Sequence, residues 1–172
     1  MNHHAHKIGG VCAAVIACTA MMQSPITYDK CLLSGTLLIG SFIGSLLPDI
    51  DHPNSKVGKK LKLLSWGINK VFGHRGLTHT LLFTMLLSIL LFFCTTFFNG
   101  YLQVMYSQFV IGVTVGYLSH LLLDSMTKSG VPLLYPFTKK HFRIAKFKTN
   151  RDEFIVSSIC IVVTSVIVAI LI

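Results

Sequence analysis

The chain has 172 residues, of which 52% are hydrophobic and only 12% are charged. Soluble domains carry about 25% charged residues, so this composition excludes an ordinary soluble domain and indicates a lipid environment. The 15 lysines and arginines outnumber the six acids and give a net charge of +9. In a membrane protein this excess is typical of loops that face anionic lipid. Basic and aromatic residues do not alternate, so we expect no nucleic-acid partner.

Five apolar segments approach the length of a membrane span, about 20 residues. They predict an all-α, polytopic membrane protein that forms a single domain over residues 1–172. The first segment resembles the core of a signal peptide, but the single Lys7 before it favours an uncleaved helix. The expected spans cover residues 8–23, 31–47, 80–98, 103–125 and 154–172.

Residues 53–72, between the second and third spans, predict an interfacial helix rather than a sixth span. Leu61, Leu64 and Ile68 recur at helical spacing, and lysines fall between them. A helix with one apolar and one basic face is typical of a segment that lies on the membrane surface.

The basic residues predict the orientation of the chain. Two loops, 52–79 and 126–152, contain most of the lysines and arginines, whereas the connections 24–30 and 99–102 contain only Lys30. Because cytoplasmic loops carry the excess of positive charge, we expect both basic loops and the N-terminus on the cytoplasmic side.

Asp49 and Asp51 close the second apolar segment, directly after Pro48. In a non-helical turn, two carboxylates at this spacing can reach one or two metal ions. The alternative is that they cap chain ends or pair with lysines. That alternative is weakened because the chain has so few acids.

The segment before the third apolar run contains His74, Arg75, Thr78 and His79. Two imidazoles five residues apart are candidate metal ligands. Arg75 offers a planar fork suited to phosphate, although it also fits a charge that sets topology. Thr78 is the predicted N-cap of the following helix.

His120 and Asp124 are four residues apart on the fourth span, so their side chains lie on one helical face. An imidazole and a carboxylate at this spacing can bind a zinc or manganese ion. The alternative is a buried pair that satisfies two polar groups. Ionisable residues in a membrane segment favour function.

Five of the candidate ligands fall at the cytoplasmic ends of their predicted helices. His6 precedes the first helix, Asp49 follows the second, His79 begins the third, and His120 and Asp124 end the fourth. We therefore expect these side chains to converge at one rim of the bundle.

The motifs resemble those of the YdjM-type bacterial inner-membrane, metal-dependent hydrolases. The matching runs are LLPDIDHP (46–53), FGHRGLTHT (72–80), GYLSH (116–120) with Asp124, and GVPLLYP (130–136). The resemblance implies an inner-membrane location and a metal-dependent hydrolase activity. It also implies a distant similarity to zinc-dependent phospholipase C and P1 nuclease.

Together these observations predict an inner-membrane hydrolase that cleaves a phosphoester at the cytoplasmic face, with a lipid-linked molecule as one candidate substrate. The expected cofactor is one or two divalent ions, zinc first and manganese or magnesium as alternatives. The expected ligands are His6, Asp49, Asp51, His79, His120 and Asp124, and the expected catalytic residues are Asp51, His74 and Arg75. Two alternatives stay open: a divalent-metal transporter, and a non-catalytic membrane protein with a structural metal.

Overall fold

The computed structural model describes residues 1–21, 27–72, 76–149 and 151–171. Within these ranges the chain forms helices, turns and loops, with two isolated β-bridges after the sixth α-helix, so the all-α prediction is confirmed. In chain order the elements are α1 (His3–Met21), α2 (Tyr28–Gly44), η1 (Pro48–Asp51), α3 (Lys56–Lys60), α4 (Lys62–Phe72), η2 (Leu77–His79), α5 (Leu81–Phe93), η3 (Cys94–Phe97), α6 (Gly100–Ser125) and α7 (Glu153–Leu171).

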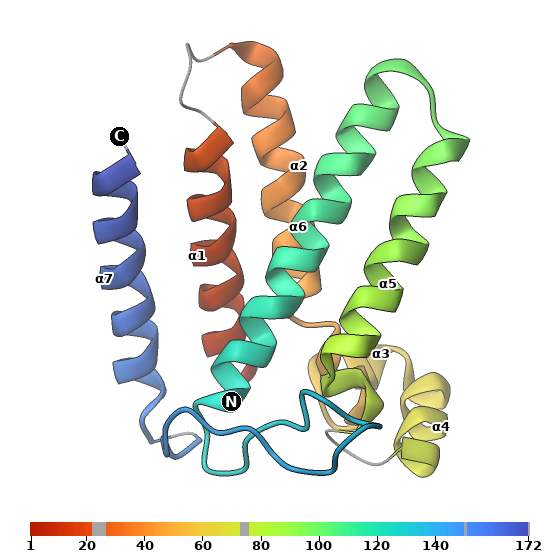
Figure 1. Cartoon of the computed structure of the whole chain (residues 1–172), viewed down its shortest axis with the longest axis vertical. Helices are drawn as coiled ribbons and strands as arrows, with labels where there is room; N and C mark the ends of the chain where they lie inside the picture. The colour runs from red at the N-terminus through yellow and green to blue at the C-terminus, as the bar shows by residue number, and fades with distance from the viewer. Residues whose placement is uncertain (22–26, 73–75, 150, 172) are drawn as a thin grey trace.

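Three helical segments of the described chain are long and apolar enough to cross a membrane: Tyr28–Asp51, Gly100–Ser125 and Glu153–Leu171. The apolar segment Leu81–Phe97 is shorter. The prediction of a helical membrane protein is thus confirmed, while the number of five spans stays a prediction. Figure 1 shows α1 and α5 running alongside the three longer segments.

The packing of α2 against α6 forms the centre of the bundle. Glycines on both helices allow the two backbones to touch. A methyl group added at Gly116 would lie 2.0 Å from the backbone oxygen of Ser41, and one at Gly44 would lie 2.1 Å from that of Val113. Small residues at such an interface are typical of membrane helices, because association there depends on close van der Waals packing.

The helix α1 packs against this pair and also contacts α7. The Ser41 hydroxyl donates a hydrogen bond of 2.7 Å to the backbone oxygen of Gly10, which joins α2 to α1. Gly9 faces Leu123 of α6, where an added Cβ would lie 2.5 Å from the leucine Cδ1. The N-terminal turn of α1 therefore lies directly against the C-terminal part of α6.

The predicted interfacial helix is two helices. It breaks at Leu61, between α3 and α4. Leu63 and Trp66 of α4 are 89% and 59% exposed, and the Lys70 ammonium lies 4.8 Å from the centre of the Trp66 ring. These exposed apolar side chains beside lysines fit a membrane surface.

The described residues of the predicted polar motifs lie at one end of the bundle, termed here the motif end. Figure 1 shows the start of α1, the C-terminal end of α6, the start of α7 and the small helices α3 and α4 at this end. The loop 126–149 runs across it. Hydrogen bonds between Val131 and Phe142, and from the Leu81 amide to the Leu133 oxygen (3.0 Å), hold the loop against the base of α5.

We predict that Gly116→Ala destabilises the protein by about 1–3 kcal/mol, because the added methyl group forces α2 and α6 apart. Gly35→Ala is the matched control on α2, since an added Cβ there meets nothing within 4 Å. Thermal unfolding in detergent, followed by circular dichroism, should show a lower melting temperature for Gly116→Ala alone. Equal melting temperatures would mean that the close contact is dispensable.

Candidate metal site

The helix α6 presents His120 and Asp124 toward α1 and the start of η1. Their four-residue spacing places them one above the other on the same face. His120 is fully buried and Asp124 is 1% exposed. Because a buried carboxylate and a buried imidazole need partners, the groups that surround them define what this position can bind.

The partner of His120 fixes which of its ring nitrogens can bind a metal. Its Nδ1 lies 2.7 Å from the backbone oxygen of Ser45, at the end of α2. A carbonyl oxygen only accepts, so Nδ1 carries the hydrogen and Nε2 keeps its lone pair. Nε2 is buried without a hydrogen bond to any described residue and lies 3.7 Å from Asp49 Oδ1. This is the arrangement of a metal-ligating histidine whose other nitrogen is held by the backbone.

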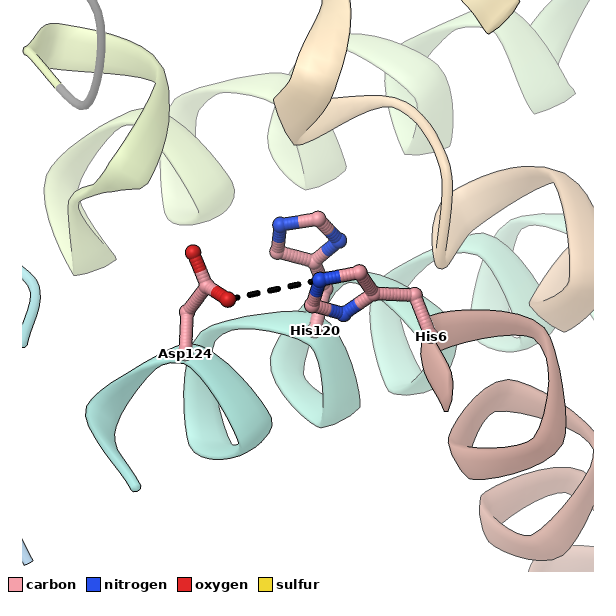
Figure 2. Close-up of side chains that lie close together, drawn as sticks. All are labelled: His6, His120 and Asp124. Carbon is pink, nitrogen blue, oxygen red and sulfur yellow. Dashed lines mark ion pairs between the residues drawn. The ribbon is translucent and has the colours of Figure 1, made fainter. Parts of the chain in front are cut away.

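His6 reaches the same place from α1. Its Nε2 lies 3.3 Å from Asp124 Oδ1, and its ring stacks on that of His120 with 3.6 Å between centroids and 10° between planes. Figure 2 shows the two rings face to face, with the carboxylate beside the His6 nitrogen. The amino group of Met1 also contacts Asp124 Oδ1.

His79 comes from η2, and Asp51 holds its ring. The His79 Nδ1 lies 3.1 Å from Asp51 Oδ2, and the Thr78 hydroxyl donates a 2.6 Å hydrogen bond to the same oxygen. With Nδ1 paired in this way, Nε2 is the nitrogen directed at Asp124, whose Oδ2 is 3.8 Å away. Asp51 therefore orients the ring from its outer side, as carboxylates do for metal-binding histidines.

Two further hydrogen bonds hold Thr78 and Asp51, the residues that orient His79, in place. The Tyr117 hydroxyl donates to the backbone oxygen of Thr78, which ties η2 to α6. The Asn69 amide of α4 donates a 2.8 Å hydrogen bond to the backbone oxygen of Asp51. The interfacial helix is thus joined to the site by a polar contact.

The side chains form two groups that could each hold a metal ion: His6, His120 and Asp124, and Asp49, His79 and His120. Within each group the ligand atoms lie within 4.8 Å of one another. The groups share His120, whose single available nitrogen can bind only one ion at a time. Imidazole and carboxylate donors suit zinc or manganese, so the donor set fits the expected cofactor.

The structure brings five of the predicted ligands into these groups and places the sixth, Asp51, next to them. Asp51 lies beside the cluster, paired with Thr78 and His79. His74 and Arg75 lie outside the described residues. The predicted N-cap is wrong: α5 begins at Leu81, so Thr80 is its N-cap and accepts from the Phe83 amide at 3.0 Å, whereas Thr78 lies in η2 and donates to Asp51.

Sequence reasoning missed Ser45 and Tyr117, and it missed the role of Thr78 as the partner of Asp51. Ser45 acts through its backbone oxygen, which no side-chain pattern can reveal. Tyr117 lies three residues before His120, so the helical period that paired His120 with Asp124 could have placed it on the same face.

These features define a helical membrane protein with a buried histidine–aspartate cluster at one end. The profile of the family described as YdjM inner membrane protein matches residues 1–172, and the chain belongs to that family. Membership of the YdjM family and the inner-membrane location are therefore confirmed, while the hydrolase activity and the distant similarity to phospholipase C and P1 nuclease stay predictions.

Individual relatives match over different shares of their length. The uncharacterized protein YvsG of Bacillus subtilis is 34% identical over 138 residues, which cover 80% of this chain and 75% of YvsG. The inner membrane protein YbcI of Escherichia coli is 34% identical over 149 residues, 81% of this chain and 77% of YbcI. The inner membrane protein YdjM of E. coli is 47% identical over 96 residues, 53% of this chain but 44% of that protein. No solved structure matches the chain.

We predict that Asp124→Asn and Asp51→Asn impair metal binding to different extents. Asp124→Asn removes a ligand and should abolish tight binding, whereas Asp51→Asn removes an orienting carboxylate and should weaken affinity about 10–100-fold. Asp29→Asn, at an exposed acid in the first turn of α2, is the control and should bind as wild type does. Competition titration with a zinc-sensitive dye measures all three. Unchanged affinity in Asp51→Asn would contradict the orienting role.

Proposed function

We propose that this protein is a metal-dependent hydrolase of the inner membrane that cleaves a phosphoester at the motif end. The observation that carries the proposal is the convergence of three buried histidines and two aspartates from four separate elements. The Nδ1 of His120 is bound by the Ser45 backbone oxygen, and the Nδ1 of His79 is bound by the Asp51 carboxylate. In both rings this directs Nε2 toward the cluster. A set of ligands oriented in advance is what a metal centre needs.

The residues that would hold the metal are His6, Asp49, His79, His120 and Asp124. A divalent ion bound there would polarise a phosphoryl oxygen and lower the pKa of its water to about 7. The distant similarity to zinc-dependent phosphoesterases, inferred from the motifs, supports a phosphoester as the bond that is cleaved.

The exposure of the two aspartates of η1 suggests which of them acts as the general base. Asp51 is fully buried, and one of its oxygens is engaged by Thr78 and His79. Asp49 is the more accessible acid, with a side chain that is 18% exposed. One carboxylate oxygen of Asp49 is enough for a metal ligand, so we assign the general-base role to its second oxygen rather than to Asp51, because a base must reach the attacking water.

Positive charge at the motif end supports an anionic substrate. The loop 126–149 carries basic side chains that attract phosphate through long-range electrostatics. Arg75 and His74 lie outside the described residues; Arg75 keeps its expected role in phosphate binding, and His74 keeps its place as a further ligand or catalytic residue. The basic residues of the loop are Lys128, Lys139, Lys140, Arg143, Lys146 and Lys148.

A structural metal site is the second candidate, and the burial of the ligands favours it. His6, His79 and His120 are fully buried and Asp124 is 1% exposed. A structural site has a closed coordination shell, whereas a catalytic site keeps one position open for water or substrate.

The test begins with the metal content of the detergent-purified protein, measured by elemental mass spectrometry beside Asp124→Ala and the control Asp29→Ala. The hydrolase proposal expects one or two equivalents of transition metal in wild type and control, and none in Asp124→Ala. It also expects hydrolysis of a chromogenic phosphodiester that falls at least about 100-fold on chelation, since a catalytic metal contributes several kcal/mol to the barrier.

Three other outcomes count against this proposal in different ways. Bound metal that exchanges no water ligand, detected by pulsed electron paramagnetic resonance after manganese substitution, would favour the structural site. Hydrolysis that survives in Asp124→Ala would place the activity elsewhere. A wild-type protein that is metal-free and takes up neither zinc nor manganese would overturn both candidates.

A further inference from the structure

A groove outside the metal site runs along an exposed, apolar side of α5 and α6. Its largest part has a volume of about 510 Å³. The hydroxyl groups in its wall are already paired: Ser88 with Thr114 at 2.8 Å, and Thr84 with the backbone oxygen of Thr80 at 2.9 Å. The wall therefore presents hydrocarbon to whatever fills it. Its main apolar lining residues are Leu81, Met85, Ile89, Phe92 and Leu118.

This groove continues toward the motif end and changes character there. Leu81 and Leu118 also line a smaller hollow of about 180 Å³, together with Phe142 of the loop. Leu81 and Phe142 in turn line a third hollow of about 450 Å³, whose walls include Lys140 and His141. Because all three hollows share Leu81, they lie next to one another, in an order that runs from an apolar end to a basic end.

The basic end is held in place by hydrogen bonds. The Phe142 amide donates to the Val131 oxygen at 2.8 Å, and Val131 returns a bond of 3.2 Å. The Lys140 amide donates to the Thr138 hydroxyl at 3.2 Å, and His141 Nδ1 lies 3.1 Å from the Ser129 oxygen. These bonds fix the backbone on which Lys140 and His141 stand at the mouth of the groove.

We propose that this groove binds one anionic phospholipid of the bilayer, with an acyl chain between α5 and α6 and its phosphate at Lys140 and His141. The row of hollows matches such a molecule in polarity along its whole length, apolar within the membrane and basic at the interface. Phe142 lines both the small hollow and the basic hollow, so in this proposal it lies where the acyl chain of the lipid joins its headgroup. This site is distinct from the metal cluster: Leu118 and Leu122 lie on a different side of α6 from His120 and Asp124.

Native mass spectrometry of the detergent-purified protein tests the proposal, with phosphatidylglycerol and phosphatidylcholine of identical acyl chains as probes. Ile89→Trp fills the groove from a position that is 56% exposed, and Ile161→Trp makes the same change on α7 at 52% exposure. Lys140→Gln removes the charge at the mouth, and Lys59→Gln removes an exposed charge of α3 at the same end of the bundle.

We expect wild type to retain one phosphatidylglycerol in preference to phosphatidylcholine. Ile89→Trp should lose that lipid while Ile161→Trp keeps it. Lys140→Gln should lower the preference for phosphatidylglycerol about fivefold, the effect of one basic residue at a lipid surface, while Lys59→Gln leaves it unchanged.

Several results would overturn the proposal. These are a wild type that retains no lipid, equal loss in the two tryptophan variants, or equal retention of the two lipids. Size-exclusion profiles of Ile89→Trp and Ile161→Trp establish that both variants are folded. The readout is binding alone, so it stands whether or not the metal site hydrolyses anything.

Discussion

The contact between α2 and α6 is the constraint on which the rest of the molecule depends. The glycines of this interface bring the backbones so close that the end of α2 lies against the middle of α6. That approach puts the Ser45 carbonyl within 2.7 Å of His120 Nδ1 and so determines which nitrogen of His120 is left to bind. The chain then enters η1 directly, which delivers Asp49 and Asp51 to the same end.

The cluster has an inner layer of candidate ligands and an outer layer of groups that orient them. Asp51, Thr78 and the Ser45 carbonyl satisfy the outward nitrogens of His79 and His120. Without them, each ring could rotate or change tautomer, and its inward nitrogen would no longer be a reliable ligand. The Asn69 bond to Asp51 extends this layer to α4, whose apolar side chains are exposed. The site and the membrane surface are therefore connected by a short chain of contacts.

The helix α6 separates two environments that a hydrolase acting on a lipid would need. One side presents His120 and Asp124 to the buried cluster, and another presents Leu118 and Leu122 to the apolar groove. The segment from His79 to Leu81 passes from one to the other within three residues, since His79 belongs to the cluster and Leu81 lines the groove. A lipid in the groove would thus lie beside the proposed metal centre without occupying it.

The sequence by itself determined the class of protein, the family and the identity of the polar residues that cluster. The high hydropathy and the low share of charged residues indicate a membrane protein. Long helices with so many apolar side chains would expose apolar surface to water, which is unfavourable, whereas lipid covers that surface. The helical period pairs His120 with Asp124, and the rarity of acids singles out Asp49 and Asp51. Only the tertiary structure decided which of these residues are candidate ligands and which orient the ligands. Whether Asp51 ligates a metal or holds His79, and whether Thr78 caps a helix or binds Asp51, depends on distances between segments far apart in the chain. Those distances are set by helix packing, which local sequence patterns do not encode.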